Sequence, residues 1–196
     1  MTAEGPTRDG TPVRAQILVS GVGGQGVLFV TRLLAEAAIL RGLRVLTSET
    51  HGMAQRGGVV VSHLKAGDFQ SPLIREGHAD GLIVLREENL TAHCRFLSPG
   101  GWAVVCAREA PGGKFPFPVH AVDSEGIAQR AGNPQGANLV LLGFALARLG
   151  AADDGGKVFC TAQELREAIA RRFEGRRALL AASLEALDLG MSLGKR

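Results

Sequence analysis

Cysteine is scarce in this 196-residue sequence, and its scarcity excludes several cofactors. The three cysteines, Cys94, Cys106 and Cys160, are widely spaced and form no Cys-x-x-Cys pair. A [4Fe–4S] cluster takes four thiolates, so this chain alone cannot hold one. Neither a zinc ribbon nor a thioredoxin-like redox pair is predicted. Three scattered thiols are typical of small buried residues in a cytoplasmic protein, and we expect a cytoplasmic location.

Long hydrophobic runs and a strong charge excess are also missing. No apolar run approaches the ~18 residues that a membrane-spanning helix needs, and residues 1–13 are too polar for a secretory signal. The chain has 22 basic and 19 acidic residues, a formal net charge of +3, with the basic residues spread along its length. We therefore expect neither a membrane nor a nucleic acid as a partner.

Two further kinds of site lack their patterns. The five histidines form no His-x-His or His-x-x-x-His pair, so no metal site is predicted. No Gly-x-Ser-x-Gly nucleophile turn is present, and hydrolase chemistry has no support. We assign no catalytic residue to this chain.

The composition is that of an ordinary globular protein, with 45% hydrophobic residues and 27 glycines that follow no regular period. Residues 1–13 are expected to be a flexible tail and residues 14–196 a single domain. Buried strands that alternate with helices predict an α/β fold, a three-layer sandwich around a mostly parallel, twisted, Rossmann-like sheet. Strands are expected at 14–20, 43–49, 59–65, 80–85, 102–107 and 119–122, and helices at 27–41, 87–97, 137–149 and 178–189. A short helix capped by Asp123 or Ser124 should run to Ala131, and another should begin after Thr161, which forms a capping-box pattern with Glu164.

A glycine-rich turn lies between the first expected strand and the first helix. Gly21, Gly23 and Gly26 satisfy the Gly-x-Gly-x-x-Gly pattern, in the strand–turn–helix context of a dinucleotide-binding fold. Glu49, at the end of the second strand, could meet a ribose. A stand-alone protein that binds NAD or FAD is therefore one interpretation. The other is a tight turn that packs the helix closely and binds no ligand.

A second cluster is more specific than the glycine pattern. It runs from His51 to Gly58 with the sequence His-Gly-Met-Ala-Gln-Arg-Gly-Gly, and Ser71-Pro-Leu-Ile74 follows. With the glycine turn, these residues resemble the gamma domain of the 2-oxoacid:ferredoxin oxidoreductases, most closely the beta subunits of the indolepyruvate branch. The chain departs from that pattern at Leu85-Arg-Glu-Glu-Asn89, which lacks a Glu-Pro pair.

The resemblance implies a subunit of a larger enzyme. Enzymes of this family oxidatively decarboxylate a 2-oxo acid such as indolepyruvate to the acyl-CoA and pass electrons to ferredoxin. Thiamine diphosphate, Mg²⁺ and [4Fe–4S] clusters are expected on a large alpha subunit, since this chain lacks the Gly-Asp-Gly pattern of a thiamine site. Coenzyme A is a possible cosubstrate at this chain, and the isolated chain is expected to form a homodimer and to be inactive.

The two loops should meet at one edge of the sheet, because both follow the carboxyl ends of strands. Arg56 could clamp an anion or pair with a partner chain, and His51 is more readily structural than a proton carrier. A module that only binds its partner and touches no ligand is the third interpretation. The residues expected to contact a ligand or a partner are Gly21, Gly23, Gly24, Gln25, Gly26, Glu49, His51, Gly52, Met53, Gln55, Arg56, Gly57, Gly58, Ser71 and Pro72.

Overall fold

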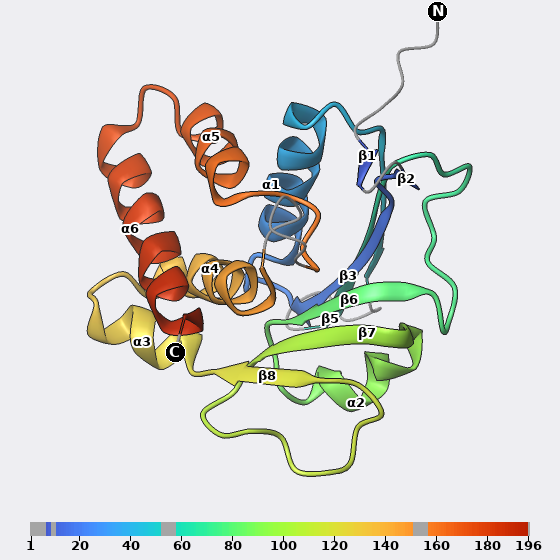
Figure 1. The fold of residues 1–196 in the computed structure, drawn as a ribbon. Coiled ribbons are helices and arrows are strands. Elements are labelled where there is room, and N and C mark those ends of the chain that lie inside the picture. The colour runs from blue at the N-terminus through green and yellow to red at the C-terminus, as the bar shows by residue number, and fades with distance from the viewer. Residues whose placement is uncertain (1–6, 9–10, 52–57, 151–156, 196) are drawn as a thin grey trace, which may run out of the picture.

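The protein folds around one six-stranded mixed sheet with helices on both faces (Figure 1). The structure is a computed structural model that describes residues 7–8, 11–51, 58–150 and 157–195. The spatial order of the strands is β4-β5-β3-β6-β7-β8. Their bounds are β3 Ala15–Val22, β4 Val45–His51, β5 Val59–Ala66, β6 Ala79–Val84, β7 Leu97–Cys106 and β8 Val119–Val122. The predicted α/β class with a mostly parallel sheet is confirmed.

One strand of the sheet runs against the others. β5 pairs antiparallel with β3 on one side and with β4 on the other, whereas β3, β6, β7 and β8 pair in parallel. The sequence predicts a simple strand–helix–strand unit from the first two strands, but β5 is inserted between them. The carboxyl ends of β3 and β4 therefore lie at the same edge as the beginning of β5.

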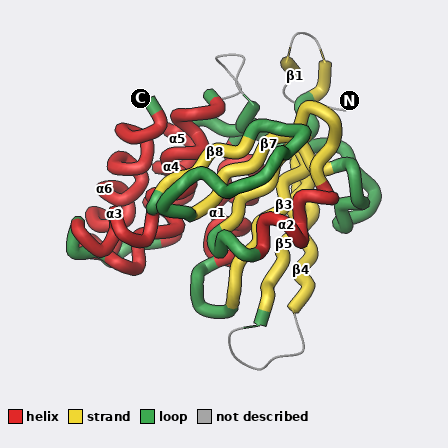
Figure 2. The backbone as a smooth tube through the Cα atoms, turned by 90° about the horizontal axis from the view of Figure 1, so that it is seen from below, coloured by secondary structure: helices red, strands yellow, loops and turns green. Residues whose placement is uncertain are grey.

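The two faces of the sheet are covered unequally. Among the described residues, five helices and the larger core lie on one face, and α2 (Asn89–His93) with its following 3₁₀ turn and loops covers the other (Figure 2). Alternation along β3 sends Ile17 and Val19 into the larger core and Leu18 into the smaller one. The helices of the thick face are α1 Val27–Leu40, α3 Ser124–Arg130, α4 Ala137–Leu149, α5 Ala162–Arg172 and α6 Arg177–Gly194.

Helices α4 and α6 pack backbone against backbone. A Cβ atom built on Gly190 would lie 2.0 Å from the Val140 carbonyl oxygen, and one on Gly143 would lie 2.1 Å from that of Leu187. The sequence predicts that the last helix ends at residue 189, before a glycine. It continues to Gly194 because Gly190 serves close packing rather than helix termination.

Local sequence signals explain several helix ends. Thr161 accepts from the Glu164 N–H and Glu164 accepts from the Thr161 N–H, which confirms the predicted capping box. The expected helix 87–97 is shorter than predicted: α2 ends at His93 and a 3₁₀ turn, Cys94–Phe96, leads directly into β7. Within the first 13 residues, β1 (Thr7–Arg8) and β2 (Thr11–Pro12) form a small antiparallel pair. No helix in the described part of the chain is both long and apolar enough to cross a bilayer.

Candidate functional site

The glycine turn and the two described ends of the second cluster, His51 and Gly58, lie at one edge of the sheet. The Gly23 N–H donates a hydrogen bond to the Gly58 carbonyl oxygen at 3.1 Å. This contact joins the segment after β3 to the segment that enters β5, as the strand ends predict. His51 ends β4 at the same edge, opposite Val60. The expected contact residues Gly52, Met53, Gln55, Arg56 and Gly57 lie outside the described residues.

The glycines of the turn serve different purposes. Gly26 adopts φ +85° and precedes α1, and a Cβ there would lie 2.3 Å from Asn138 Nδ2. A Cβ on Gly21 would lie 2.9 Å from Val27 Cγ2. Gly24, at φ +95°, has no atom within 4 Å of such a Cβ. Packing inside the chain therefore accounts for Gly21 and Gly26, while no described residue packs against the position of a Gly24 Cβ.

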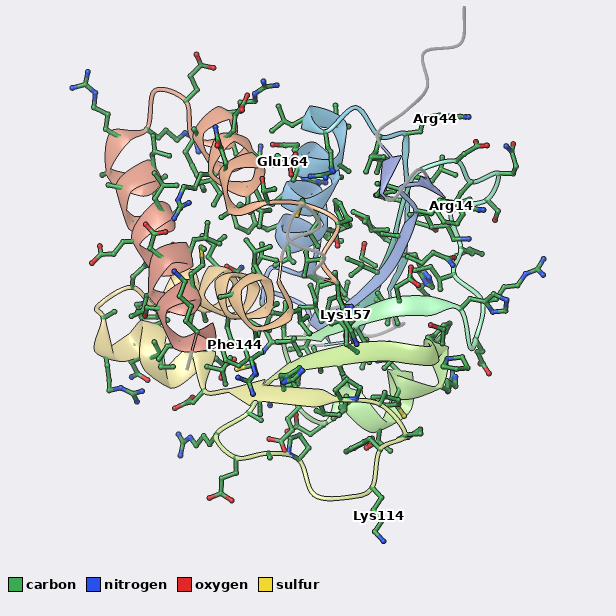
Figure 3. All side chains as sticks on the ribbon, in the orientation of Figure 1. Arg14, Arg44, Lys114, Phe144, Lys157 and Glu164 are labelled. Atoms are coloured by element: carbon green, nitrogen blue, oxygen red, sulfur yellow. The ribbon has the colours of Figure 1, made fainter. Side chains whose placement is uncertain are left out.

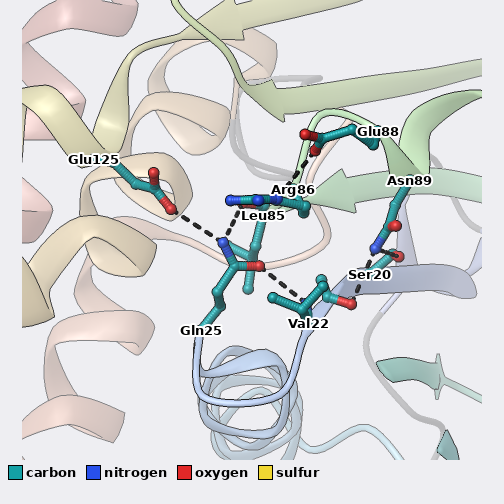
Figure 4. Close-up of polar contacts among 9 residues, drawn as sticks. Ser20, Val22, Gln25, Leu85, Arg86, Glu88, Asn89 and Glu125 are labelled. Atoms are coloured by element: carbon teal, nitrogen blue, oxygen red, sulfur yellow. Dashed lines mark hydrogen bonds and ion pairs between the residues drawn. The ribbon is translucent and has the colours of Figure 1, made fainter. Parts of the chain in front are cut away.

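Gln25 ties the turn to two other parts of the chain (Figure 4). Its Oε1 accepts from the Val22 N–H at 3.0 Å, and its Nε2 donates to the Leu85 carbonyl at 3.1 Å and to Glu125 Oε1 at 3.0 Å. Asn138 Nδ2 in turn donates to the Gln25 carbonyl at 3.3 Å. The Gln25 amide, expected to contact a ligand, is thus used within the chain.

A buried polar network supports the turn from the thin face of the sheet. Asn89 Nδ2 donates to the Gly21 carbonyl at 3.0 Å and to Ser20 Oγ at 3.1 Å (Figure 4). Ser20 Oγ also bonds His93 Nδ1 at 2.9 Å. Burial, with the nearby Arg95 charge, lowers the pKa of His93 below its usual value. The neutral ring is therefore the form that belongs to this network.

A cleft opens beside the turn at the carboxyl ends of β6, β7 and β8. It consists of two adjoining hollows of about 560 and 640 Å³, which share Leu85, Cys106, Glu125 and Gln129, and Gly24 and Gln25 line the first. Open α/β sheets bind ligands at this edge. Gly24 and Gln25 were predicted from the sequence, whereas Leu85, Cys106, Glu125 and Gln129 were missed. Leu85 follows β6, Cys106 ends β7 and Glu125 lies in the first turn of α3, and these positions are the signal that could have identified them.

The cleft wall contains polar atoms without a partner. Ser124 is fully buried, and neither its Oγ nor the buried Oδ1 of Asn138 has a hydrogen-bond partner among the described residues. Buried polar atoms are usually bonded. The wall next to the glycine turn therefore has hydrogen-bonding capacity that the chain itself does not use.

Metal chemistry has no site in the described part of the chain. No group of three His, Cys, Asp or Glu side chains there could hold an ion. Cys94, Cys106 and Cys160 are free thiols on separate elements. Burial strongly raises the pKa of Cys160, which keeps that thiol protonated. An iron–sulfur cluster does not fit these residues.

Glu49 does not stand beside the glycine turn within the sheet. It lies exposed on β4, and β5 separates that strand from β3. Two strand spacings amount to roughly 10 Å. In a dinucleotide-binding fold, the acidic residue follows a strand that neighbours the glycine turn. The inserted antiparallel strand removes that neighbour relation and weakens the nucleotide interpretation.

Ser71 and Pro72 belong to a different end of the sheet. They lie in the loop that leaves the carboxyl end of β5, which is antiparallel, so the loop begins at the edge opposite the glycine turn. Farther along the loop, the Ile74 N–H donates to His63 Nδ1 at 3.2 Å. The structure thus brings Gly23 and Gly58 together and starts the Ser71–Pro72 loop from the other edge.

Comparison with known proteins gives one family and several relatives. The family model described as pyruvate ferredoxin/flavodoxin oxidoreductase matches residues 16–193. The chain is 36% identical to the indolepyruvate oxidoreductase subunit IorB of Archaeoglobus fulgidus, over 67% of this chain and 76% of that protein. It is 32% identical to the subunit of the same name from Thermococcus kodakarensis, over 65% of this chain and 74% of that protein.

Solved structures share the fold. The gamma subunit of a keto/oxoacid ferredoxin oxidoreductase from Geobacter sulfurreducens is 25% identical, with a TM-score of 0.72 over 92% of this chain and 98% of that one. A 2-oxoglutarate:ferredoxin oxidoreductase from Magnetococcus marinus, with 2-oxoglutarate, coenzyme A and succinyl-CoA bound, has a TM-score of 0.73 and is 24% identical. The match covers 97% of this chain but only 32% of that one.

Proposed function

Because the chain belongs to the pyruvate ferredoxin/flavodoxin oxidoreductase family, we propose that it is the non-cofactor subunit of an indolepyruvate-type 2-oxoacid:ferredoxin oxidoreductase. The complex would oxidatively decarboxylate indolepyruvate or another aryl or other 2-oxo acid, transfer the acyl group to coenzyme A and pass two electrons singly to ferredoxin. The observation that carries this proposal is the 36% identity to a subunit named indolepyruvate oxidoreductase.

We place the cofactors of this reaction on a large partner subunit. Thiamine diphosphate with Mg²⁺ would supply the decarboxylation chemistry, and [4Fe–4S] clusters the path for single electrons. Three cysteines cannot make a four-thiolate cluster site, and the described residues provide no metal-binding group. The free thiols also suit the cytoplasmic location that we propose.

The edge built by the glycine turn is the surface that we assign to the partner and to coenzyme A. The Gly23 and Gln25 N–H groups are bonded within the chain, whereas no described residue accepts from the Gly24 N–H. Open space in front of Gly24 would let a phosphate or a partner backbone approach the start of α1, where free N–H groups favour an anion. Arg56, in the segment between β4 and β5, is the proposed cationic contact for the same group.

Reconstitution with the partner subunit tests the assignment. The complex should reduce ferredoxin with indolepyruvate and coenzyme A, and each subunit alone should not. The Arg56→Ala complex should still assemble and should raise the KM for coenzyme A about tenfold, since a charge-assisted contact is lost. Arg44→Gln is the matched control because Arg44 is an exposed arginine at the opposite edge of the sheet, paired with Asp68 at 3.0 Å. Unchanged constants in R56A would restrict this edge to partner binding.

Calorimetry on the isolated chain tests the nucleotide-binding alternative. If the chain were a stand-alone NAD or FAD protein, it would bind one of them at micromolar concentration. We expect no heat at millimolar NAD or FAD. Micromolar binding would favour the stand-alone nucleotide-binding protein over the oxidoreductase subunit.

We also propose that the isolated chain pairs with itself. β4 is an outer strand of the sheet, and unpaired strand edges favour association. The exposed apolar side chains Ile39, Val59, Leu73 and Leu179 add surface that a partner would cover. Sedimentation velocity at two concentrations should show a dimer, and a clean monomer at the higher concentration would contradict this part of the proposal.

A further inference from the structure

A group of positive side chains lies at the opposite edge of the sheet from the glycine turn. Alternation along β3 and β5 puts Arg14, Gln16 and Lys65 on the thin face, and Gln16 and Lys65 stand directly opposite each other in the ladder. The loop that follows β5 brings Phe69 against them. Figure 3 shows Arg14 and Arg44 at the end of the molecule where β3 begins.

One aromatic ring contacts two of these cations. The Arg14 guanidinium carbon lies 4.3 Å from the Phe69 ring centroid, and Lys65 Nζ lies 5.1 Å from it. Burial lowers the pKa of Lys65, and the charges of Arg75, on the same loop, and of Arg14 lower it further. Two cations, Arg14 and Lys65, therefore share the Phe69 ring, and Arg75 adds a third positive charge within electrostatic range of Lys65.

The burial of Lys65 is unusual for an unpaired lysine. The residue as a whole is only 8% exposed, but its Nζ is not one of the buried atoms without a partner. The stem is therefore buried and the ammonium reaches the surface, where an anion can approach it. No hydrogen bond or ion pair joins its ammonium to a described residue, although an ammonium has three hydrogens to donate. Phe69 supplies a cation–π contact and no acceptor.

Neighbouring arginines at this edge form ion pairs with acidic side chains, whereas Arg14, Lys65 and Arg75 do not pair with any described residue. Arg44 bonds Asp68 at 3.0 Å and Arg95 bonds Glu76 at 2.8 Å. Neither Arg14 nor Arg75 has an ion pair with a described residue. Asp80 is a nearby carboxylate: burial raises its pKa, and the Arg14 charge acts in the opposite direction. Its Oδ2 already accepts from the Gln16 N–H at 2.7 Å.

We propose that Arg14, Lys65 and Arg75 form a binding site for a phosphate-class oxyanion at the edge of the sheet opposite the glycine turn. A doubly charged anion would balance the excess charge and give the Lys65 ammonium the acceptors that it lacks. The two guanidinium groups can each bind an oxyanion with paired N–H donors. The source of the anion is either inorganic phosphate or the diphosphate of a larger ligand, and both share this chemistry.

Titration calorimetry of the full chain at low salt, with inorganic phosphate and with pyrophosphate, tests the site. We expect millimolar or tighter binding, with pyrophosphate binding more tightly than phosphate if a diphosphate ester is the natural source. Lys65→Met keeps the buried stem and removes the charge, and it should weaken binding at least tenfold. Arg44→Gln, a nearby arginine with its own partner, should change binding less than twofold.

Amide chemical shifts locate the bound anion independently of any variant. Shifts that move at residues 14–16 and 65–75 would support the site. Shifts confined to residues 23–29 would assign the anion to the glycine turn and overturn the proposal. Absence of binding at 10 mM pyrophosphate, or equal affinity in K65M and wild type, would also overturn it. None of these results depends on the partner subunit, so the proposed function is tested separately.

Discussion

Glycine serves two purposes in this molecule, and the contrast separates scaffold from site. Between α4 and α6, Gly143 and Gly190 let two helix backbones touch, and any side chain there would meet a carbonyl oxygen. In the turn before α1, Gly24 meets nothing within 4 Å. Packing inside the chain therefore explains why Gly143 and Gly190 are glycines. At Gly24, only the positive φ and the approach of a group from outside the described residues explain the glycine.

The largest loss of stability is expected at Gly190, where helix packing alone explains the glycine. Gly190→Ala places a methyl group against the Val140 carbonyl and must separate α4 from α6, which should lower the free energy of unfolding by about 3 kcal/mol. Chemical denaturation measures the loss. Gly112→Ala, at a glycine with open space around it and no positive φ, is the control and should change stability little. Equal losses of stability in the two variants would show that Gly190 is not required for the close packing of α4 and α6.

The turn before α1 contains glycines of both kinds, Gly24 and Gly26, and alanine substitutions should distinguish them. Gly26→Ala combines a positive φ with a clash against Asn138 and should cost about 2 kcal/mol. Gly24→Ala has only the backbone penalty and should cost about 1 kcal/mol. In the reconstituted complex, we expect the order to reverse at equal folded fraction, with Gly24→Ala lowering activity more. If G24A is fully active, the open space in front of Gly24 has no function.

The smallest effect concerns the polar network behind the turn. Burial lowers the pKa of His93 from 6.5, and the same holds for His63. Below pH 6.5 the unfolded chain binds protons that the folded chain takes up less readily, so stability should fall as the pH drops from about 7 towards 5. His93→Gln should reduce that slope in urea titrations at several pH values. An unchanged slope would contradict the lowered pKa of the buried His93.

The periodicity of apolar residues and the helix-capping pattern allowed much of the fold to be predicted from the sequence. The six strands of the main sheet and the Thr161 capping box follow from local pattern, because each depends on neighbouring residues. The direction of β5 did not follow, since the alternation of 59–65 is the same for a parallel and an antiparallel strand. The continuation of α6 through Gly190 was missed because only the packing partner Val140 reveals why a glycine stands there.

The candidate site was predictable in part for the same reason. The meeting of Gly23 with Gly58 follows from strand ends, which the sequence marks. The use of Gln25 inside the chain depends on Leu85 and Glu125, which are distant in sequence. Lys65 gave no sequence signal, because its burial and its ring contact exist only after the loop that follows β5 has folded over the sheet.

Native purification of the tagged chain from its own cells tests the central claim most directly. We expect a large partner in stoichiometric amount that carries a thiamine-binding pattern and Cys-x-x-Cys motifs. The pair should reduce ferredoxin in the presence of coenzyme A and indolepyruvate or another aryl or other 2-oxo acid. A chain that returns alone, carries a bound nucleotide and shows no activity with any 2-oxo acid would contradict it.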